Sequence, residues 1–86
     1  MDKKKEFTVK FNKNVNDSWC GCAYFVNNTL GQVYMVTCAA SPQEKKVTAS
    51  GKIKERLTAY EGWIQTRHPD WRRVNQEDYE NFPAQK

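Results

Sequence analysis

The sequence predicts an α+β fold, in which a three-stranded antiparallel meander is followed by one long amphipathic helix packed on the sheet. Residues 6–39 hold runs rich in aromatic and β-branched side chains, which favour strands. After position 41, apolar residues recur at helical spacing. A chain of 86 residues supports one core. We therefore expect a single domain over 1–86, with sheet in 6–39, helix in 41–66 and a C-terminal extension in 67–86.

The first strand is predicted from strict alternation in residues 6–12. Phe7, Val9 and Phe11 are expected on one side, with polar residues on the other. Residues 12–18 are rich in Asn, Asp and Ser, which hydrogen-bond to nearby backbone and favour a loop. Residues 1–5, with three lysines, are expected to be a flexible basic N-terminus.

Two further strands, about residues 19–27 and 32–39, flank a hairpin signal at residues 28–31, where Asn and Gly tolerate positive φ. The hairpin register decides which side chains meet. If Tyr24 lies opposite Tyr34, a tyrosine pair remains on the outer sheet face. A shift by one residue places Tyr34 beside Phe25 instead. The first register is expected to bury five residues under the helix: Trp19, Ala23, Phe25, Val33 and Met35.

The helix start is predicted at Ser41, because Ser41-Pro42-Gln43-Glu44 combines an N-cap serine, a proline at the first helical position and a glutamate that bonds back to the cap. Five apolar residues downstream form a stripe expected to pack on the sheet: Ala49, Ile53, Leu57, Tyr60 and Ile64. Gly51 and Gly62 mark positions for a bend or a close backbone contact.

The C-terminal extension is expected to begin with a turn over residues 67–70, because His68 precedes Pro69 and is pushed toward extended geometry. Residues 71–74 then predict a short fourth strand. Asn75, followed three residues later by Asp78, resembles a cap for a final helical turn through Phe82.

Charge and composition indicate which partners and which cellular location to expect. The net charge is +4, and the basic surplus lies before residue 74, since Glu77, Asp78 and Glu80 make the tail acidic. Such a field favours phosphate or an acidic protein surface. No apolar run reaches the roughly 18 residues of a membrane span, and no signal peptide is evident. We expect a cytoplasmic protein without membrane contact.

The cysteines are expected to be reduced thiols without a metal. Cys20, Cys22 and Cys38 are odd in number, whereas small secreted domains usually pair their cysteines. Cys20 and Cys22 lack the spacing of zinc motifs and, on a strand, point the same way. No nucleophile elbow, phosphate loop or Cys-His pair is recognisable. We therefore expect no catalytic residue, no cofactor and no enzymatic role.

Two candidate binding surfaces remain. The first is the aromatic sheet, where Tyr24, Tyr34 and Trp19 are expected to contact a protein partner. The second is a set of basic residues suited to neutralising phosphates. It comprises Lys10, Lys45, Lys46, Lys52, Lys54, Arg56, Arg67, Arg72 and Arg73.

The order strand, strand, strand, helix resembles that of AP2-type and integrase-arm DNA-binding domains, HicB-like antitoxins and several small phage-encoded inhibitors of bacterial defence systems. The resemblance concerns element order and assigns no functional residue. In the DNA-binding families it implies a basic sheet that reads the major groove. Here no Lys or Arg occurs from Trp19 to Ala40, which argues against groove reading.

The sequence thus favours a small non-enzymatic protein that acts through protein-protein contact, such as an inhibitor or accessory factor of phage or mobile-element type. Its partner would be a protein, including one in a nucleic-acid-handling complex. The alternative is a small nucleic-acid-binding module that uses the helix and the N-terminal basic residues on phosphates.

Overall fold

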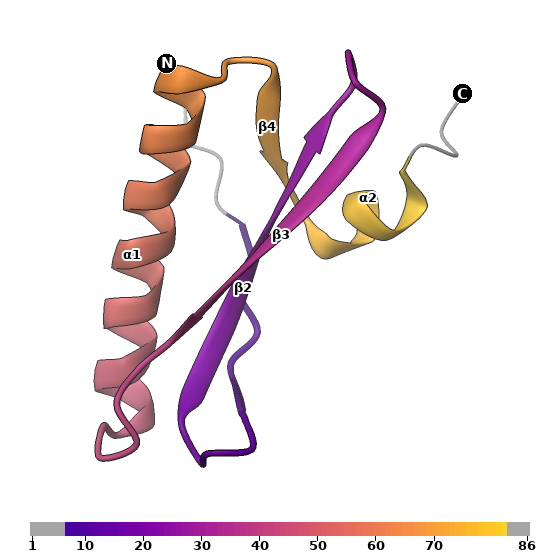
Figure 1. The fold of residues 1–86 in the computed structure, drawn as a ribbon. Helices are drawn as coiled ribbons and strands as arrows, with labels where there is room; N and C mark the ends of the chain where they lie inside the picture. The colour runs from indigo at the N-terminus through magenta and orange to yellow at the C-terminus, as the bar shows by residue number, and fades with distance from the viewer. Residues whose placement is uncertain (1–6, 83–86) are drawn as a thin grey trace, which may run out of the picture.

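The computed structural model describes residues 7–82, which form four strands and two helices. In chain order these are β1 (Asn12–Lys13), β2 (Trp19–Asn27), β3 (Gln32–Ala39), α1 (Lys46–Arg67), β4 (Trp71–Val74) and α2 (Gln76–Asn81). The basic N-terminus expected over residues 1–5 lies outside the described residues, as do residue 6 and residues 83–86. Figure 1 shows α1 along one side of the sheet and α2 on the other. The predicted helix-on-sheet α+β fold is confirmed.

β2 is the central strand of the sheet. β3 pairs with one of its edges, while β1 and β4 pair with the two ends of the other edge, and all pairs are antiparallel. The strands predicted at 19–27, 32–39 and 71–74 are therefore confirmed. The hairpin loop between β2 and β3 forms where expected, with Gly31 at φ +68° and the Asn27 side-chain oxygen accepting a 2.9 Å hydrogen bond from Leu30 N–H.

The first strand is shorter than predicted. Residues 7–11 have no regular secondary structure, and pairing is confined to β1. The physical reason is competition for one edge of β2, because β4 occupies that edge from Tyr24 onward through the Tyr24–Val74 pair. The alternation still has a structural role, since Val9 and Phe11 pack against the core.

The helix starts later than predicted, and the capping-box interpretation is wrong. Ser41 opens a turn, in which Glu44 N–H donates to the Ser41 carbonyl oxygen at 3.0 Å and Gln43 N–H donates to Ser41 Oγ at 3.3 Å. The cap position is instead Lys45, which is extended and makes no side-chain cap hydrogen bond. Because Ala40 N–H still donates to Trp19 O in the sheet, the chain uses this turn to reverse direction before α1 begins.

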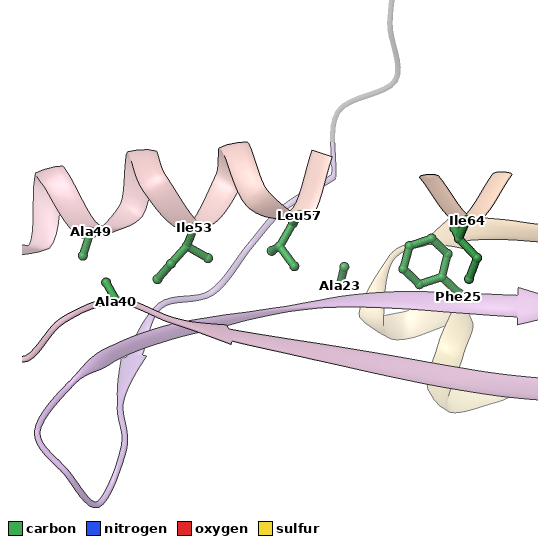
Figure 2. Packing of buried hydrophobic residues seen from close by; sticks show 7 residues of the cluster. All are labelled: Ala23, Phe25, Ala40, Ala49, Ile53, Leu57 and Ile64. Carbon is green, nitrogen blue, oxygen red and sulfur yellow. The ribbon is translucent and has the colours of Figure 1, made fainter. Parts of the chain in front are cut away.

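The predicted apolar stripe of α1 faces the sheet. Figure 2 shows side chains from α1 pointing at β2 and at the end of β3. The cluster of buried residues comprises Ala23, Phe25, Ala40, Ala49, Ile53, Leu57 and Ile64, with Tyr60 half-buried beside it. Burying each large member contributes about 1.5–3 kcal/mol. Neither helix in residues 7–82 is long and apolar enough to cross a lipid bilayer.

The glycine that makes close contact is Gly21, not the helical glycines. A Cβ added at Gly21 would lie 2.8 Å from Val9 Cγ1, 3.1 Å from Phe11 Cε1 and 3.2 Å from Ile53 Cγ2. Gly51 and Gly62 have open space around them. Because Gly21 has no side chain, Val9 and Phe11 of the N-terminal segment can pack against the core at this point. A side chain at position 21 would displace that segment.

The second sheet face is covered at one end by α2. Val26 of β2 and Val74 of β4 are buried there. The short helix begins after Asn75, as predicted, although the Asn75 side chain makes no cap hydrogen bond. Cover by α2 leaves the β3 side of this face exposed.

Candidate protein-binding edge

The hairpin register places Tyr24 and Tyr34 on opposite faces of the sheet. Phe25 lies opposite Tyr34, and Tyr24 lies opposite Met35. The expected Tyr24–Tyr34 pair is therefore wrong, and the register shifted by one residue holds. The hairpin loop sets it, because Gly31 N–H donates to the Asn27 carbonyl oxygen at 2.8 Å and Asn27 lies opposite Gln32.

The same register reverses the expected burial of Val33 and Met35. Both lie on the face away from α1, because side chains alternate along β3 and Tyr34 faces the helix. They are 40% and 46% exposed. The expectation that the helix covers them is wrong, and they form an exposed apolar strip instead.

Tyr24 is half-buried beneath α2. Its ring centroid lies 4.9 Å from that of Tyr79. Burial, together with the neighbouring Cys22 and Glu80, raises the pKa of the Tyr24 hydroxyl. Lys10, one of the expected phosphate contacts, lines the same cleft as Tyr24 and Glu80. Tyr24 therefore acts mainly in packing α2 onto the sheet.

Tyr34 belongs to a row of aromatic rings on the α1 side. Its centroid lies 6.5 Å from that of Tyr60, and Tyr60 lies 5.6 Å from Trp63. We call these three residues the aromatic shelf. Tyr60 is anchored in the core by Phe25 at 5.8 Å, whereas Tyr34 and Trp63 are 45% and 46% exposed. The shelf is therefore held from beneath, and Tyr34 and Trp63 remain about half exposed, although Trp71 packs against Tyr34 at 6.1 Å.

The two tyrosine hydroxyls of the shelf interact. Burial and then hydrogen bonding to Tyr34 raise the pKa of Tyr60 to about 12. The Tyr60 phenol is therefore neutral at physiological pH, and Tyr60 presents an uncharged ring in the middle of the shelf.

Trp19, the third predicted contact, is not part of this row. It lies at the first residue of β2, whereas Tyr34 pairs near the last. The ammonium groups of Lys13 and Lys46 lie 5.3 Å and 5.4 Å from the Trp19 ring centroid. The structure thus distributes the three predicted protein contacts over three separate places.

β3 has one edge to which no strand within residues 7–82 pairs. Ala40 N–H donates to Trp19 O at 2.9 Å, so the alternation of an antiparallel ladder directs the backbone groups of Val33, Met35 and Thr37 away from β2. We call this unpaired side of residues 33–37 the β3 edge. Natural edge strands usually carry charges, proline or a bulge that discourage pairing. β3 contains no charged residue and no proline.

Arg56 of α1 covers the C-terminal end of this edge. Its Nη1 donates to the Ala39 carbonyl oxygen at 3.0 Å and lies 3.9 Å from Cys38 Sγ. The Ala39 carbonyl is one of the groups that the alternation directs outward. Arg56 thus hydrogen-bonds to the last outward carbonyl oxygen of β3, that of Ala39, and the backbone groups of the β3 edge remain unpaired.

The basic residues expected to contact phosphates are spread over the molecule. Lys45 and Lys46 lie at the start of α1 and Arg67 at its end, about 30 Å away at the helical rise. Arg72 and Arg73 follow each other on β4 and face opposite sides of the sheet, because Arg72 lies opposite Val26 and Arg73 lies opposite Phe25. These residues do not form one continuous surface.

Several of these cations also have partners within the chain. Arg73 Nη1 lies 3.1 Å from Glu61 Oε1, and the Arg73 side chain is only 7% exposed. Lys52 Nζ lies 2.6 Å from Glu44 Oε2. By contrast, Lys54 lines the outer surface of α1.

The cysteines do not converge on one point. Cys20 and Cys22 share the face away from α1, whereas Cys38 packs on the helix side, and all three thiols are free. Within residues 7–82 no three His, Cys, Asp or Glu side chains form a group that could hold a metal ion.

Sequence reasoning missed the aromatic shelf and the β3 edge. The helical stripe predicts that Tyr60 packs in the core, and it does not include Trp63. The spacing of Tyr60 and Trp63, three residues apart on one helix, was the signal that their rings would meet. The edge position of β3 follows from its place at the end of a meander, provided that the fourth strand pairs elsewhere, as it does.

No family model matches the chain, and searches of curated proteins and of solved structures find no significant similarity.

Proposed function

We propose that the chain is a small binding protein that acts through protein contact rather than catalysis. It accepts an extended segment of a partner as an additional strand on the β3 edge. The observation that carries this proposal is the unpaired, uncharged β3 edge lying directly beside an exposed aromatic shelf. An inhibitor or accessory factor that occupies a partner's segment would act in this way.

Strand addition uses both the backbone and the side chains of the site. The outward backbone groups of residues 33, 35 and 37 supply hydrogen bonds of about 0.5–1.5 kcal/mol each. Alternate side chains of the added strand then meet opposite faces. One set contacts Tyr34 and the shelf, and the other contacts Val33 and Met35. Exposed aromatic anchors of this kind commonly dominate binding energy.

A peptide-display selection against the folded protein tests the proposal. Selected peptides should slow amide hydrogen exchange at Val33, Met35 and Thr37, because strand pairing protects those N–H groups. Met35→Pro removes an outward N–H without removing a hydrogen bond to β2, so it should abolish binding. Met35→Ala keeps the N–H and should weaken binding only modestly.

Two results would overturn strand addition. One is recovery of peptides that bind while exchange at the β3 edge is unchanged. The other is full binding by a folded Met35→Pro variant. Circular dichroism of each variant establishes folding, and the exchange measurement on the unaltered protein stands even if the proline variant does not fold.

A nucleic-acid-binding role is the second candidate. It is favoured by the ammonium groups of Lys13 in β1 and Lys46 at the start of α1, which both lie beside the Trp19 ring. Cations next to an aromatic ring suit a phosphate backbone with stacked bases. Binding of single-stranded oligonucleotides that weakens steeply with salt, and that Lys13→Gln and Lys46→Gln each reduce, would support it. Salt-independent or absent binding would contradict it.

A further inference from the structure

The flank of α1 that lies beside β3 is basic. Arg56 defines this flank, because it donates to Ala39 O in β3. Helical periodicity places Lys52, Trp63 and Arg67 on the same flank, at spacings of four, seven and eleven residues from Arg56. The β3 edge therefore runs beside cations as well as the aromatic shelf.

The two acidic residues of α1 lie elsewhere on the helix. Glu61 is on the flank toward β4, where it binds Arg73. Glu55 lines the outer surface of α1 together with Lys54 and Thr58. Within residues 7–82 neither glutamate forms a salt bridge with Arg56 or Arg67, whereas Lys52 of this flank is paired with Glu44 at 2.6 Å.

Two cations of α1 flank the helical residues of the aromatic shelf along the helix, Arg56 before Tyr60 and Arg67 after Trp63. The Arg67 guanidinium lies over the Trp63 ring, 5.0 Å from its centroid. Arg56, four residues before Tyr60 on α1, uses one nitrogen on the Ala39 carbonyl, and a guanidinium carries five N–H donors. Both groups are exposed, so each has donors available to a carboxylate.

We infer that the segment accepted by the β3 edge is acidic, with carboxylates at the alternate positions that face α1 and apolar side chains at those that face Val33 and Met35. This inference rests on the proposed function, strand addition at the β3 edge. It adds the chemistry of the partner, which is set by charge complementarity with Arg56 and Arg67.

The backbone of the β3 edge favours a polypeptide over a nucleic acid as the occupant. An unpaired strand edge presents N–H and C=O groups in alternation, and an extended peptide satisfies both. A phosphate backbone offers acceptors and would leave the outward carbonyls unpaired.

A second copy of this chain is also a poorer match than an acidic segment. β3 contains no carboxylate, so a β3–β3 pair would offer no anion to Arg56 or Arg67. Two copies would in addition bring together molecules that each carry a net charge of +4.

Three synthetic peptides of the length of β3 test the inference. They alternate valine with glutamate, threonine or lysine and carry acetyl and amide ends. At low salt the glutamate peptide should bind at least about fivefold more tightly than the threonine peptide, because exposed ion pairs each contribute modestly, and the lysine peptide should bind most weakly. The difference should shrink as salt rises.

Charge-removing variants locate the effect. Arg56→Gln combined with Arg67→Gln should abolish the preference for glutamate over threonine. Lys54→Gln combined with Arg72→Gln removes the same net charge away from the β3 edge and should leave the preference within about twofold, because those side chains are far from the bound strand.

The outcomes separate the inference from the proposed function. If the threonine or lysine peptide protects the β3 amides and binds as tightly as the glutamate peptide, strand addition stands and the acidic preference is wrong. If no peptide protects those amides, both fail. Displacement of a bound glutamate peptide by single-stranded DNA, or a dimer in sedimentation that excludes the peptide, would also overturn the inference.

Discussion

The guanidinium of Arg56 on α1 donates a 3.0 Å hydrogen bond to the carbonyl oxygen of Ala39, the last residue of β3. This contact ties the middle of the helix to the end of the edge strand. It also limits the unpaired part of that strand to residues nearer the hairpin loop. One side chain thus contributes to both stability and the extent of the candidate site.

Arg56→Ala should lower the free energy of unfolding by about 1 kcal/mol, since a hydrogen bond from a charged donor is lost at an exposed position. Urea denaturation measures the change. Lys54→Ala is the matched control, because it removes a cation from the outer surface of the same helix. Equal effects of the two substitutions would show that the Ala39 contact adds no stability.

Gly21→Ala should destabilise the protein by about 1–3 kcal/mol, because the new methyl group would overlap Val9 and crowd Phe11 and Ile53. Gly51→Ala should instead stabilise it by up to about 1 kcal/mol, because Gly51 is an exposed helical position with open space. Thermal unfolding of both variants checks the opposite signs. A Gly21→Ala protein as stable as the original would mean that the N-terminal segment does not pack there.

Lys45→Asp should stabilise the protein by about 0.5–2 kcal/mol, because Lys45 occupies the cap position without a side-chain cap bond and an aspartate there can accept one. Ser41→Ala should change stability by less than about 0.5 kcal/mol, because Ser41 lies in an exposed turn before the helix. Chemical denaturation compares the two. A larger loss for Ser41→Ala than gain for Lys45→Asp would place the helix start back at Ser41.

Stability should fall as pH rises from about 10 to about 12, because the folded state holds the neutral Tyr60 phenol. The folded pKa is raised from 10.0 to about 12, so the stabilising contribution is complete below pH 10 and is lost as pH approaches 12. Tyr60→Phe removes this titration. The unfolding free energy of the original protein should fall relative to that of Tyr60→Phe as pH rises across that range. Parallel curves would contradict the pKa shift.

Glu61→Ala should cost about 1.5–3 kcal/mol, because it leaves the nearly buried Arg73 guanidinium without its carboxylate. Glu61→Gln should recover part of the loss by keeping an acceptor. Glu55→Ala, which removes a carboxylate from the exposed outer surface of α1, is the control and should be nearly neutral. A neutral Glu61→Ala would show that this ion pair does not stabilise the fold.

Local patterns in the sequence determined which elements form. The α1 stripe from Ala49 to Ile64, the strands at 19–27 and 32–39, and the turn before β4 were all predictable, because the period of the apolar residues and the placement of Gly, Asn and Pro are local signals. The same signals made the helix-on-sheet arrangement predictable, since each element has one apolar face to bury.

Only the tertiary structure decided which faces meet, and with them the candidate site. A register shift of one residue exchanges the faces of Tyr34 and Met35, and a local pattern does not distinguish the two registers. The length of the first strand depended on β4, which pairs with the same edge of β2. The start of α1 depended on the residue at which the chain leaves the sheet after β3. These features arise from pairing between distant segments, so no window of neighbouring residues contains them.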